Sequence, residues 1–405
     1  MRLKDFSVLN PQYKGESLDC EVSFVPMESL RNGAIDYQDI PFAEGKGKYT
    51  YFQDGDLLVA KVTPCFENGN IAIANNMKQG VGFGSSEIFV LRMNDKVLNT
   101  YMFYITQTAK FQEGACATMC GVGGLKRISP LFMRTYELDI PSLSKQQRIV
   151  DYLGVKLGKI DARIAVLEKQ QDAYARLKKS VIHHAVTHGL DPNVSLKDSG
   201  VEWIGMIPEH WEVKRIKELC SFVSRGATPN YVDEGEYKVM NQAVFSTGNL
   251  NHKVVRYSSY MKSESQIKKG DLLIASTGGG VLGKLYFFDD EDLNFYADTH
   301  VTIVRSEKGL FCVKFLFYLL SYQFDMVNTC MAKGSTNQTE LQRDCLLSYE
   351  LAIPSLVEQQ TIIAYLDEKC AKIDTATENI GKQIDALKRL KRALINEVVT
   401  GQRAV

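Results

Sequence analysis

Two stretches of this chain carry the same pattern: "YELDIPSLSKQQRIVDYL" at residues 136–153 and "YELAIPSLVEQQTIIAYL" at residues 349–366. The offset between them is 349 − 136 = 213 residues. Without a gap, the same offset pairs "KID" at 159–161 with "KID" at 372–374. Self-similarity at a fixed offset is the signature of a repeated structural unit. The sequence therefore predicts two copies of one unit.

The repeat reaches back towards the start of the chain. With two residues inserted, "GDLLVAK" from Gly55 matches "GDLLIAS" from Gly270, and "RLK" at 2–4 matches "RIK" at 215–217. The first copy has no counterpart of "IPEHW" (207–211), so we expect either that its globular part lacks an opening strand or that the given sequence starts inside this domain. Each copy is then a globular part followed by a helical part.

The helical parts show apolar residues at alternating steps of four and three. This 3.5-residue period predicts a left-handed coiled coil, with Gln171 and Thr377 as polar interruptions. Because two copies of one unit can pair isologously, we expect its two helices to run antiparallel. An alternative is that each apolar stripe packs on its own globular part. The stripes comprise Leu153, Leu157, Ile160, Ile164, Leu167, Tyr174, Leu177 and Val181, and then Leu366, Cys370, Ile373, Ile380, Ile384, Leu387, Leu390 and Leu394.

Start and stop signals bound both helices. A capping box is predicted at each start, because a Ser lies three residues before a Gln or Glu, just after an Ile-Pro that ends a strand. Gly189 ends the first helix, and Gly401 lies near the end of the second. The predicted boxes are Ser144 with Gln147 and Ser355 with Glu358.

The globular parts read as mixed α/β. Short apolar runs such as "EIFVLR" (87–92) and "HVTIVR" (300–305) predict strands, and "YMFYITQT" (101–108) and "KFLFYLLSYQFD" (314–325) predict a buried helix in each copy. The predicted organisation is a globular domain at 1–143, a helix at 144–188, a linker at 189–212, a second globular domain at 213–355 and a second helix at 356–405.

The linker contains the only two tryptophans, Trp203 and Trp211. Aromatic residues in a segment rich in Gly, Pro, Asp and Ser indicate a linker that is docked on a neighbouring surface. We expect them to hold the opening strand of the second globular part.

Composition sets loose bounds on function. The chain has 405 residues, 45% of them apolar, and no apolar run long enough to cross a bilayer. Its nine cysteines form no C-x-x-C pair, which predicts reduced thiols in a cytoplasmic protein. Lys plus Arg equals Asp plus Glu at 48 each, so total charge counts against a nucleic-acid partner unless basic residues gather on one face.

Three motifs that suggest catalysis or metal binding are incomplete. In "GDLLIASTGGGVLGKLYF" (270–287), Leu285 stands where a phosphate-binding loop needs Ser or Thr, and strand-like residues follow instead of a helix. "NPQY" (10–13) lacks the second Pro of an adenine methyltransferase motif, and no glycine-rich cofactor loop precedes it. His184 and His188 lie one helical turn apart without the Glu of H-E-x-x-H, so we predict no metal.

The repeated motifs of this chain together resemble those of the specificity subunit of type I restriction-modification enzymes. The resemblance rests on the two helix openings quoted above, on "AVTHGLDPN" closing the first helix, on "IPEHWEVKRI" opening the second globular part and on "GDLLIAS" within it. It covers essentially the whole chain.

The resemblance implies a non-catalytic protein with two target-recognition domains, each reading one half of a split site in double-stranded DNA. It also implies two helices that act as a spacer and dock two methyltransferase subunits, with motor and nuclease subunits joining the full complex. No cofactor is expected on this chain, since S-adenosylmethionine would bind the methyltransferase partner. The alternatives are a coiled-coil scaffold with two protein- or glycan-binding modules, and an enzyme that uses the glycine loop.

Candidate DNA-contacting residues follow from side-chain chemistry. Arg, Asn and Gln have bidentate geometry for guanine or adenine edges, Lys suits phosphates, and Ser or Thr suits either. Ordinary surface solvation is the competing interpretation for each one. The candidates are Lys61, Asn68, Asn70, Lys126 and Arg127 in the first copy, and Arg225, Thr228, Asn230, Asn241, Gln242, Ser276, Thr277, Lys284, Lys333, Ser335, Asn337 and Gln338 in the second.

Overall fold

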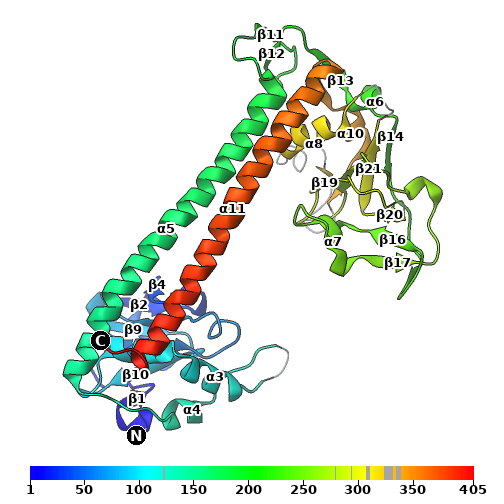
Figure 1. Ribbon diagram of the computed structural model, residues 1–405. Coiled ribbons are helices and arrows are strands. Elements are labelled where there is room, and N and C mark those ends of the chain that lie inside the picture. The colour runs from blue at the N-terminus through cyan, green and yellow to red at the C-terminus, as the bar shows by residue number, and fades with distance from the viewer. Residues whose placement is uncertain (122–123, 279, 293, 307–310, 323–331, 334–338) are drawn as a thin grey trace. The chain divides into compact units, whose positions relative to one another are not determined.

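The computed structural model describes residues 1–121, 124–278, 280–292, 294–306, 311–322, 332–333 and 339–405 (Figure 1). The chain divides into two compact units. Unit 1 comprises Met1–Lys169 and Ile380–Val405, and unit 2 comprises Gln170–Asn379. Each unit contains a globular part of strands and short helices together with segments of both long helices.

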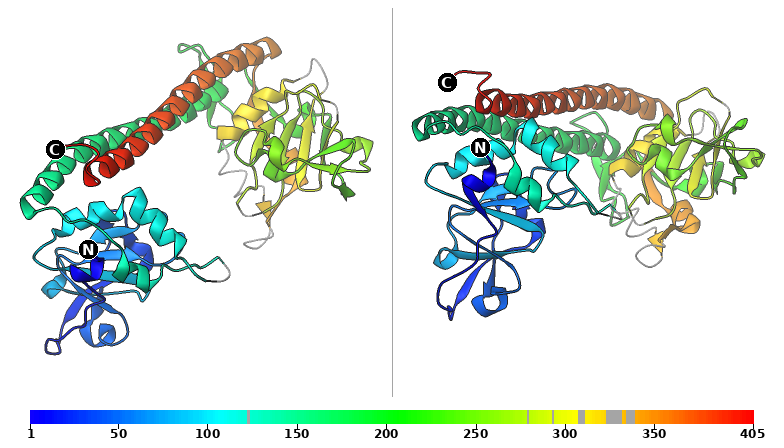
Figure 2. Two further views of the ribbon diagram at one scale, coloured as in Figure 1. Left: turned by 60° about the horizontal axis from the view of Figure 1, so that its bottom comes forward. Right: turned by 90° about the horizontal axis from the view of Figure 1, so that it is seen from below.

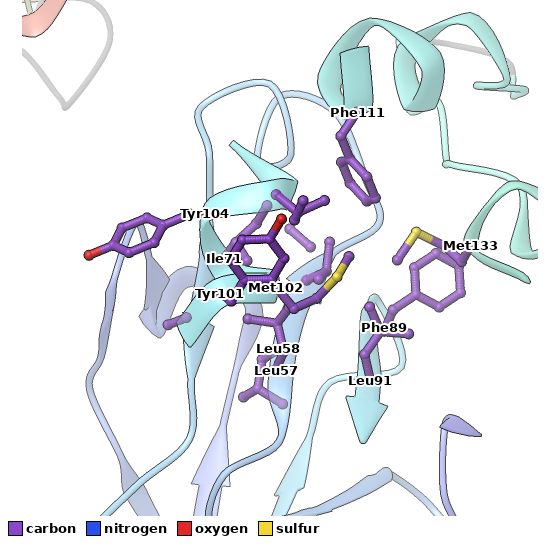
Figure 3. Packing of buried hydrophobic residues seen from close by; sticks show 14 of the residues in the cluster. Leu57, Leu58, Ile71, Phe89, Leu91, Tyr101, Met102, Tyr104, Phe111 and Met133 are labelled. Atoms are coloured by element: carbon purple, nitrogen blue, oxygen red, sulfur yellow. The ribbon is translucent and has the colours of Figure 1, made fainter. Parts of the chain in front are cut away.

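The main sheet of unit 1 is antiparallel, with strand order β1-β10-β7-β8. These strands are β1 (Ser7–Leu9), β7 (Leu57–Ala60), β8 (Ile71–Ile73) and β10 (Ile88–Met93). Every residue of β7 is buried, because β10 and β8 flank it and α2 (Asn99–Thr106) packs on the sheet. Figure 3 shows Tyr101 and Met102 of α2 beside Leu57 and Leu58 in this core.

A second sheet of unit 1 has the order β5-β2-β9-β6. Its centre is a parallel pair, in which Phe24 faces Phe83. The remaining elements are short helices and turns around the two sheets. Unit 1 further contains η1 (Leu3–Asp5), β2 (Glu21–Val25), η2 (Met27–Ser29), β3 (Leu30–Arg31), β4 (Ala34–Ile35), β5 (Gln38–Pro41), α1 (Phe42–Gly45), β6 (Thr50–Gln53), η3 (Lys78–Gly80), β9 (Val81–Gly84), α3 (Ala109–Ala117) and α4 (Pro130–Thr135).

The main sheet of unit 2 repeats that of unit 1 strand for strand, in the order β14-β21-β18-β19 and again antiparallel. The strands are β14 (Phe222–Arg225), β18 (Leu272–Ala275), β19 (Leu285–Phe287) and β21 (Val301–Arg305). The helix α8 (Val313–Tyr322) contacts β18 and β19 as the counterpart of α2. The predicted repeat, its strands and its two buried helices are confirmed, except that residues 323–325 of the second predicted helix lie outside the described residues.

The second sheets differ at one edge. Unit 2 has the order β15-β17-β16-β20 and again contains one parallel pair, β16 with β20, which here lies at the edge of the sheet. Its extra strand β15 adds beside β17, whereas β6 of unit 1 adds beside β9. Unit 2 further contains β11 (Leu196–Asp198), β12 (Met206–Pro208), β13 (Glu212–Arg215), α6 (Ile216–Leu219), β15 (Tyr231–Val232), β16 (Tyr237–Met240), α7 (Gln242–Phe245), η4 (His252–Val254), β17 (Arg256–Ser258), η5 (Ser263–Ser265), β20 (Phe295–Ala297), β22 (Ala332–Lys333), β23 (Glu340–Leu341), α10 (Arg343–Ser348) and β24 (Glu350–Ile353).

Two long helices, α5 (Leu143–His188) and α11 (Leu356–Val399), contribute to both units. They run antiparallel in unit 2, where Gln171 reaches the carbonyl of Thr377 and Lys178 pairs with Asp374. In unit 1, Lys391 pairs with Asp161, and Figure 2 shows the two helices side by side. The offset of 213 relates Asp161 to Asp374 and Lys178 to Lys391, so both units contain the same interhelical ion pair. The antiparallel pairing is confirmed within each unit, while the coiled-coil supercoil stays a prediction.

The predicted apolar stripe is wrong at Leu177 and Leu390, which are about half exposed. In α5 the next partly buried position after Tyr174 is Lys178, a step of four residues. In α11 the next partly buried position after Leu387 is Lys391, again a step of four residues. A straight helix has 3.6 residues per turn and drifts away from a strict 3.5-residue repeat. The lysine therefore takes the place of the leucine, and its ammonium group reaches the aspartate of the opposite helix.

The alternative in which the stripes pack on globular parts is also correct at the helix ends. In unit 1 the core includes Leu153 and Leu157 of α5 and Leu394 of α11. In unit 2 the core includes Ile182 and Leu366. In each unit, one of the buried apolar clusters thus joins the globular part to its own helix segments and stabilises both.

The helix starts are fixed by buried glutamines. Gln146 accepts a hydrogen bond from the Leu98 amide at 2.9 Å and donates to the carbonyls of Lys96 and Pro141, both at 2.9 Å. Gln359 accepts from the Cys312 amide at 3.0 Å and donates to the Pro354 carbonyl at 3.0 Å. This explains why the first Gln of each Gln-Gln pair recurs: it connects the helix to the loop before α2 or α8.

The predicted capping boxes are only partly correct. Ser355 caps α11 by accepting a bond from the Glu358 amide at 3.3 Å. The carboxylate of Glu358 does not complete the box; it accepts bonds from His210 and Trp211. In the first copy Ser144 lies inside α5, which begins at Leu143, and its hydroxyl pairs with that of Ser142.

The expected docking of the linker is confirmed for Trp211. Its ring is fully buried, and its indole N–H donates to Glu358 at 3.1 Å. Trp203 is 48% exposed and stacks beside Tyr349. The strand β13 that follows Trp211 pairs with β24, whereas in unit 1 the equivalent contact is a single bridge between Arg2 and Glu137.

Candidate nucleic-acid interface

A buried ion pair supports the same place in both main sheets. Asp56 precedes β7 and binds the Arg92 guanidinium through two bonds of 2.9 and 2.7 Å. Asp271 precedes β18 and binds Arg305 through two bonds of 2.7 and 2.6 Å. Both carboxylates are at most 2% exposed. Bidentate geometry restrains both side chains of each pair. Because the pair recurs at the equivalent place in both main sheets, we call it the shared framework of the two units.

Matching backbone hydrogen bonds define one location at the far end of each of these sheets. The Lys61 amide donates to the Glu87 carbonyl at 2.9 Å, and the Ser276 amide donates to the His300 carbonyl at 2.8 Å. Beside them, isolated bridges pair Val62 with Arg127 and Thr277 with Glu340. We call this location the variable locus: its positions are 61, 87 and 127 in unit 1 and 276, 300 and 340 in unit 2. Their backbones correspond, but all three side chains differ.

The side chains at the locus of unit 1 form what we call the first polar cluster: Lys61, Glu87 and Arg127. Arg127 binds Glu87 through Nε at 2.8 Å and Nη2 at 2.9 Å. This bond is the main cause that lowers the pKa of Glu87. Lys61 lies over the Phe89 ring, 4.7 Å from its centroid, and donates to the Ser86 carbonyl, while burial lowers its pKa. The cluster combines two cationic side chains with one carboxylate.

Unit 2 has different chemistry at the same locus. What we call the second polar cluster comprises Arg225, Gln242, Thr277, His300 and Glu340. Thr277 Oγ1 lies 2.7 Å from His300 Nδ1 and donates to Gln242 Oε1 at 3.4 Å. Arg225 pairs with Glu340 at 3.2 Å and also donates to the Leu341 carbonyl. The cluster thus presents an amide, a hydroxyl and an imidazole beside one ion pair.

The residue two positions before Glu87 in unit 1 and before His300 in unit 2 also differs between the units. In unit 1 the Ser85 hydroxyl accepts a bond from the Glu87 amide at 3.2 Å. In unit 2 the Asp298 carboxylate accepts the equivalent bond from the His300 amide at 2.9 Å. Asp298 is 3% exposed, and burial raises its pKa. The same backbone turn is therefore capped by a hydroxyl in one unit and by a buried carboxyl in the other.

The structure thus brings Lys61 and Arg127 together, and also Arg225, Gln242 and Thr277. Lys126 is exposed beside Arg127, and its amide bonds to Thr63. Among the other candidates, Thr228 and Asn230 are exposed, and Asn230 donates to the Ser259 hydroxyl. Asn241 caps α7 through the Ala243 amide.

Three candidates occupy other positions. Asn68 lines a cavity of about 530 Å³ with Glu113 and Arg392. Asn70 and Ser276 are buried, and the Ser276 hydroxyl bonds to Thr302 and to the Ile274 carbonyl, so it serves the core of the sheet. Of the last group, Lys333 has only its backbone described, paired with Glu340, while Ser335, Asn337 and Gln338 lie outside the described residues.

The glycine-rich stretch is a turn. It joins the antiparallel strands β18 and β19, and Lys284 follows Gly283, whose φ of 76° suits glycine. Gly69 has a φ of 75° at the matching turn before β8. A phosphate-binding loop would open a helix, whose amides face the phosphates. A strand begins at Leu285 instead, as the sequence predicted.

Sequence reasoning missed Glu87, His300 and Glu340. Each follows a short apolar run or precedes one, with no motif of its own. The repeat contained a usable signal, because the offset of 213 places Glu87 opposite His300 and Arg127 opposite Glu340. Polar positions that change between two otherwise matching copies would have identified the locus.

The described part of the chain has neither a cluster of metal-binding side chains nor a membrane-spanning helix. No three His, Cys, Asp or Glu side chains gather there in a way that would hold a metal ion, and the rings of His184 and His188 stack 5.4 Å apart. In the same residues, no helix combines the length and the apolar character that crossing a bilayer requires.

The family described as "Type I restriction modification DNA specificity domain" matches residues 14–171 and 208–386. The two matches correspond to the two copies of the repeat. The chain belongs to this family of DNA specificity domains.

Individual relatives agree with that assignment. The specificity subunit of type I restriction enzyme EcoEI from Escherichia coli is 34% identical over 152 residues, which cover 36% of this chain and 26% of that protein. This chain therefore spans about a quarter of the length of that relative. The MjaVIII specificity subunit from Methanocaldococcus jannaschii is 25% identical over 398 residues, covering 96% of this chain and 87% of that protein.

A solved structure shares the fold. It is described as "Structural basis underlying complex assembly and conformational transition of the type I R-M system", and it matches with a TM-score of 0.76 over 98% of this chain and 96% of its own. Because the sequences are only 17% identical, the likeness concerns the fold.

Proposed function

We propose that this protein is the DNA-recognition subunit of a type I restriction-modification system. Each globular part reads one half of a bipartite site in double-stranded DNA. The observation that carries the proposal is the variable locus. Two copies of one framework keep the same buried ion pair and the same glutamine anchor, yet present different polar side chains at one end of the sheet. Two different half-sites require this combination of a constant framework and changed contacts.

The protein itself is non-catalytic in this proposal. Supporting this, the glycine-rich turn between β18 and β19 leads into a strand rather than a helix. Two methyltransferase subunits bind S-adenosylmethionine and transfer the methyl group, and motor and nuclease subunits join the full complex. A scaffold that binds proteins or glycans is not favoured, because the family match covers both copies.

The paired helices set the gap between half-sites and dock the methyltransferase subunits. The proposal is supported by the continuous helical course of α5 and α11 and by the repeated ion pair between them. One heptad added to both helices lengthens each by roughly 10 Å at 1.5 Å per residue. That length corresponds to about three base pairs. A heptad variant should therefore keep both half-site sequences while the preferred gap grows or specific binding is lost.

The test is to express the chain with its methyltransferase partner in cells and to sequence their DNA with detection of methylated bases. The expected result is one bipartite motif with two specific parts and a fixed unspecific gap. Cells that express the partner with an unrelated specificity subunit are the control. Absence of new methylation from a complex that assembles on purification, or methylation without a split motif, would contradict the proposal.

A further inference from the structure

We infer that Arg127 reads a guanine in the half-site recognised by unit 1, and that Glu87 orients it for this contact. The inference rests on the proposed function, because it assumes that unit 1 meets DNA. It adds which residue specifies a base, which base that is, and how the protein holds the reading group.

The hydrogen-bond geometry carries the inference. Glu87 holds Arg127 side-on, through Nε at 2.8 Å and Nη2 at 2.9 Å. A guanidinium has five N–H donors in a planar fork, and these two bonds use two of them. The opposite edge of the guanidinium, with one N–H from each Nη atom, is not used by Glu87. Its two N–H groups are parallel and have the spacing of the guanine O6 and N7 acceptors. A side-on carboxylate therefore fixes the plane of the arginine without blocking its guanine-binding edge.

The backbone around Arg127 also suits a reading group. Arg127 stands at the base of a hairpin, where its amide and carbonyl bond to those of Cys120, and the bridge with Val62 ties the hairpin to the end of β7. The Arg127 side chain is 49% exposed and the Glu87 side chain 30% exposed. A half-exposed arginine that is already held by Glu87 and by two backbone bonds loses less conformational entropy when it binds, which favours affinity.

The charge around the pair favours an electronegative ligand. Lys61 lies next to Glu87 in the first polar cluster, and Lys126 precedes Arg127 in the chain. The bond to Arg127 lowers the pKa of Glu87, so the orienting carboxylate stays ionised at neutral pH. Three cationic side chains around one carboxylate leave the site positive, as the guanine edge of the major groove and the neighbouring phosphates require.

Unit 2 provides the matched contrast. Position 340 there is a glutamate that pairs with Arg225, and position 300 is a histidine bonded to Thr277. A glutamate accepts hydrogen bonds and cannot donate to guanine O6 or N7. Position 340 of unit 2 therefore cannot make the contact inferred for Arg127. The arginine of the second polar cluster, Arg225, comes from β14 instead and is bound through Nη2 to Glu340 and to the Leu341 carbonyl.

The experiment is selection of DNA by the complex of this chain with its methyltransferase partner, from duplexes randomised at every specific position. The variants are Arg127→Lys, which keeps the charge but loses the fork, and Glu87→Gln, which loosens the orientation. Arg127→Lys should reduce the preference for guanine at one position of the first half-site by roughly ten- to a hundredfold. Glu87→Gln should reduce it less, and neither should change the second half-site.

Two controls separate the possible outcomes. Lys126→Ala should weaken binding to all sequences alike, as expected for a phosphate contact. Arg225→Lys should leave the first half-site unchanged. If Arg127→Lys behaves like Lys126→Ala, with uniform weakening and an unchanged motif, Arg127 contacts phosphate and the inference is overturned. It is equally overturned if the wild-type first half-site contains no guanine. A wild-type complex that selects no bipartite motif instead refutes the proposed function, while thermal unfolding of each variant shows that it is folded.

Discussion

The two units of this chain are alike in the residues that stabilise their framework and different at one end of their main sheets. The Asp–Arg pair under the main sheet, the glutamine at the helix start and the ion pair between the helices all recur at the offset of the repeat, within two residues. The variable locus at the end of the same sheet instead has Lys61, Glu87 and Arg127 in one unit and Ser276, His300 and Glu340 in the other. Comparing the copies thus separates residues that stabilise the shared fold from positions that are candidates for contacting DNA.

The largest loss in the free energy of unfolding should come from breaking the buried Asp–Arg pair of either unit. Asp56→Ala and Asp271→Ala each leave a guanidinium without its bidentate partner. Breaking a buried pair costs 3–5 kcal/mol, and we expect about 3 kcal/mol because the arginines keep some contact with water. Denaturant unfolding should show a similar loss for both variants. Glu291→Ala, which breaks an exposed pair with Lys269, should have a much smaller effect on the free energy of unfolding, because exposed ion pairs contribute little to stability. A framework variant as mild as this control would mean that the pair is not structural.

The second largest loss of stability should come from replacing the buried glutamines at the helix starts. Gln146→Ala and Gln359→Ala remove hydrogen bonds from buried amides and carbonyls, at a cost of about 1–3 kcal/mol. Among the described residues, Gln146 bonds to one amide and two carbonyls and Gln359 to one amide and one carbonyl, so both variants should lose stability. The matched control is Gln147→Ala at an exposed position. Equal melting temperatures for all three variants would contradict a role for the first glutamine of each pair.

A pH-dependent difference should distinguish the units. Burial raises the pKa of Asp298 above 3.8, so the folded state favours the protonated form. Its contribution to stability is complete below the unfolded pKa and is lost as pH rises through the folded pKa. Asp298→Asn should therefore stabilise unit 2 at pH 7 and give no gain near pH 3. Asp298→Ser, which installs the residue of unit 1, should act in the same direction. Thermal unfolding at several pH values checks this, and a gain that shrinks with rising pH would refute it.

The smallest effect concerns the helices. Asp161→Lys replaces an exposed interhelical attraction to Lys391 with repulsion and should cost about 0.2–1 kcal/mol. Adding Lys391→Asp should restore most of that stability, since the pair is rebuilt with its charges exchanged. A double-mutant cycle measured by denaturant unfolding gives the coupling energy. A coupling of zero would show that this ion pair does not help to align the helices.

Much of the fold could be predicted from the sequence because the repeat and its period are visible in it. The strands around Gly55 and Gly270, the buried helices, the helix ends at Gly189 and the role of Trp211 all follow from local patterns. Leu177 and Leu390 could not be placed, because a 3.5-residue and a 3.6-residue stripe diverge only after several turns. The start of α5 was misjudged because Ser142 and Ser144 both fit a helix start.

The candidate site was less accessible to sequence reasoning. Chemistry alone selected Arg127 and Thr277 together with Asn70 and Ser276, although the last two are buried. Residue type cannot distinguish a hydroxyl that bonds inside a sheet from one on its rim. Glu87 and His300 are polar residues at strand edges, which is common on any surface. Only the backbone bonds across the sheet show that they share a location with Lys61 and Ser276.

The central claim is that the variable locus selects each half-site independently. The most direct measurement is to give unit 1 the residues of unit 2, as Lys61→Ser, Glu87→His and Arg127→Glu together, and to determine the methylated motif in cells that express this chain with its methyltransferase partner. The account predicts that the first half-site changes while the second half-site and the gap stay as in the wild type. An unchanged first half-site, or a simultaneous change in both half-sites from a folded and assembled complex, would contradict it.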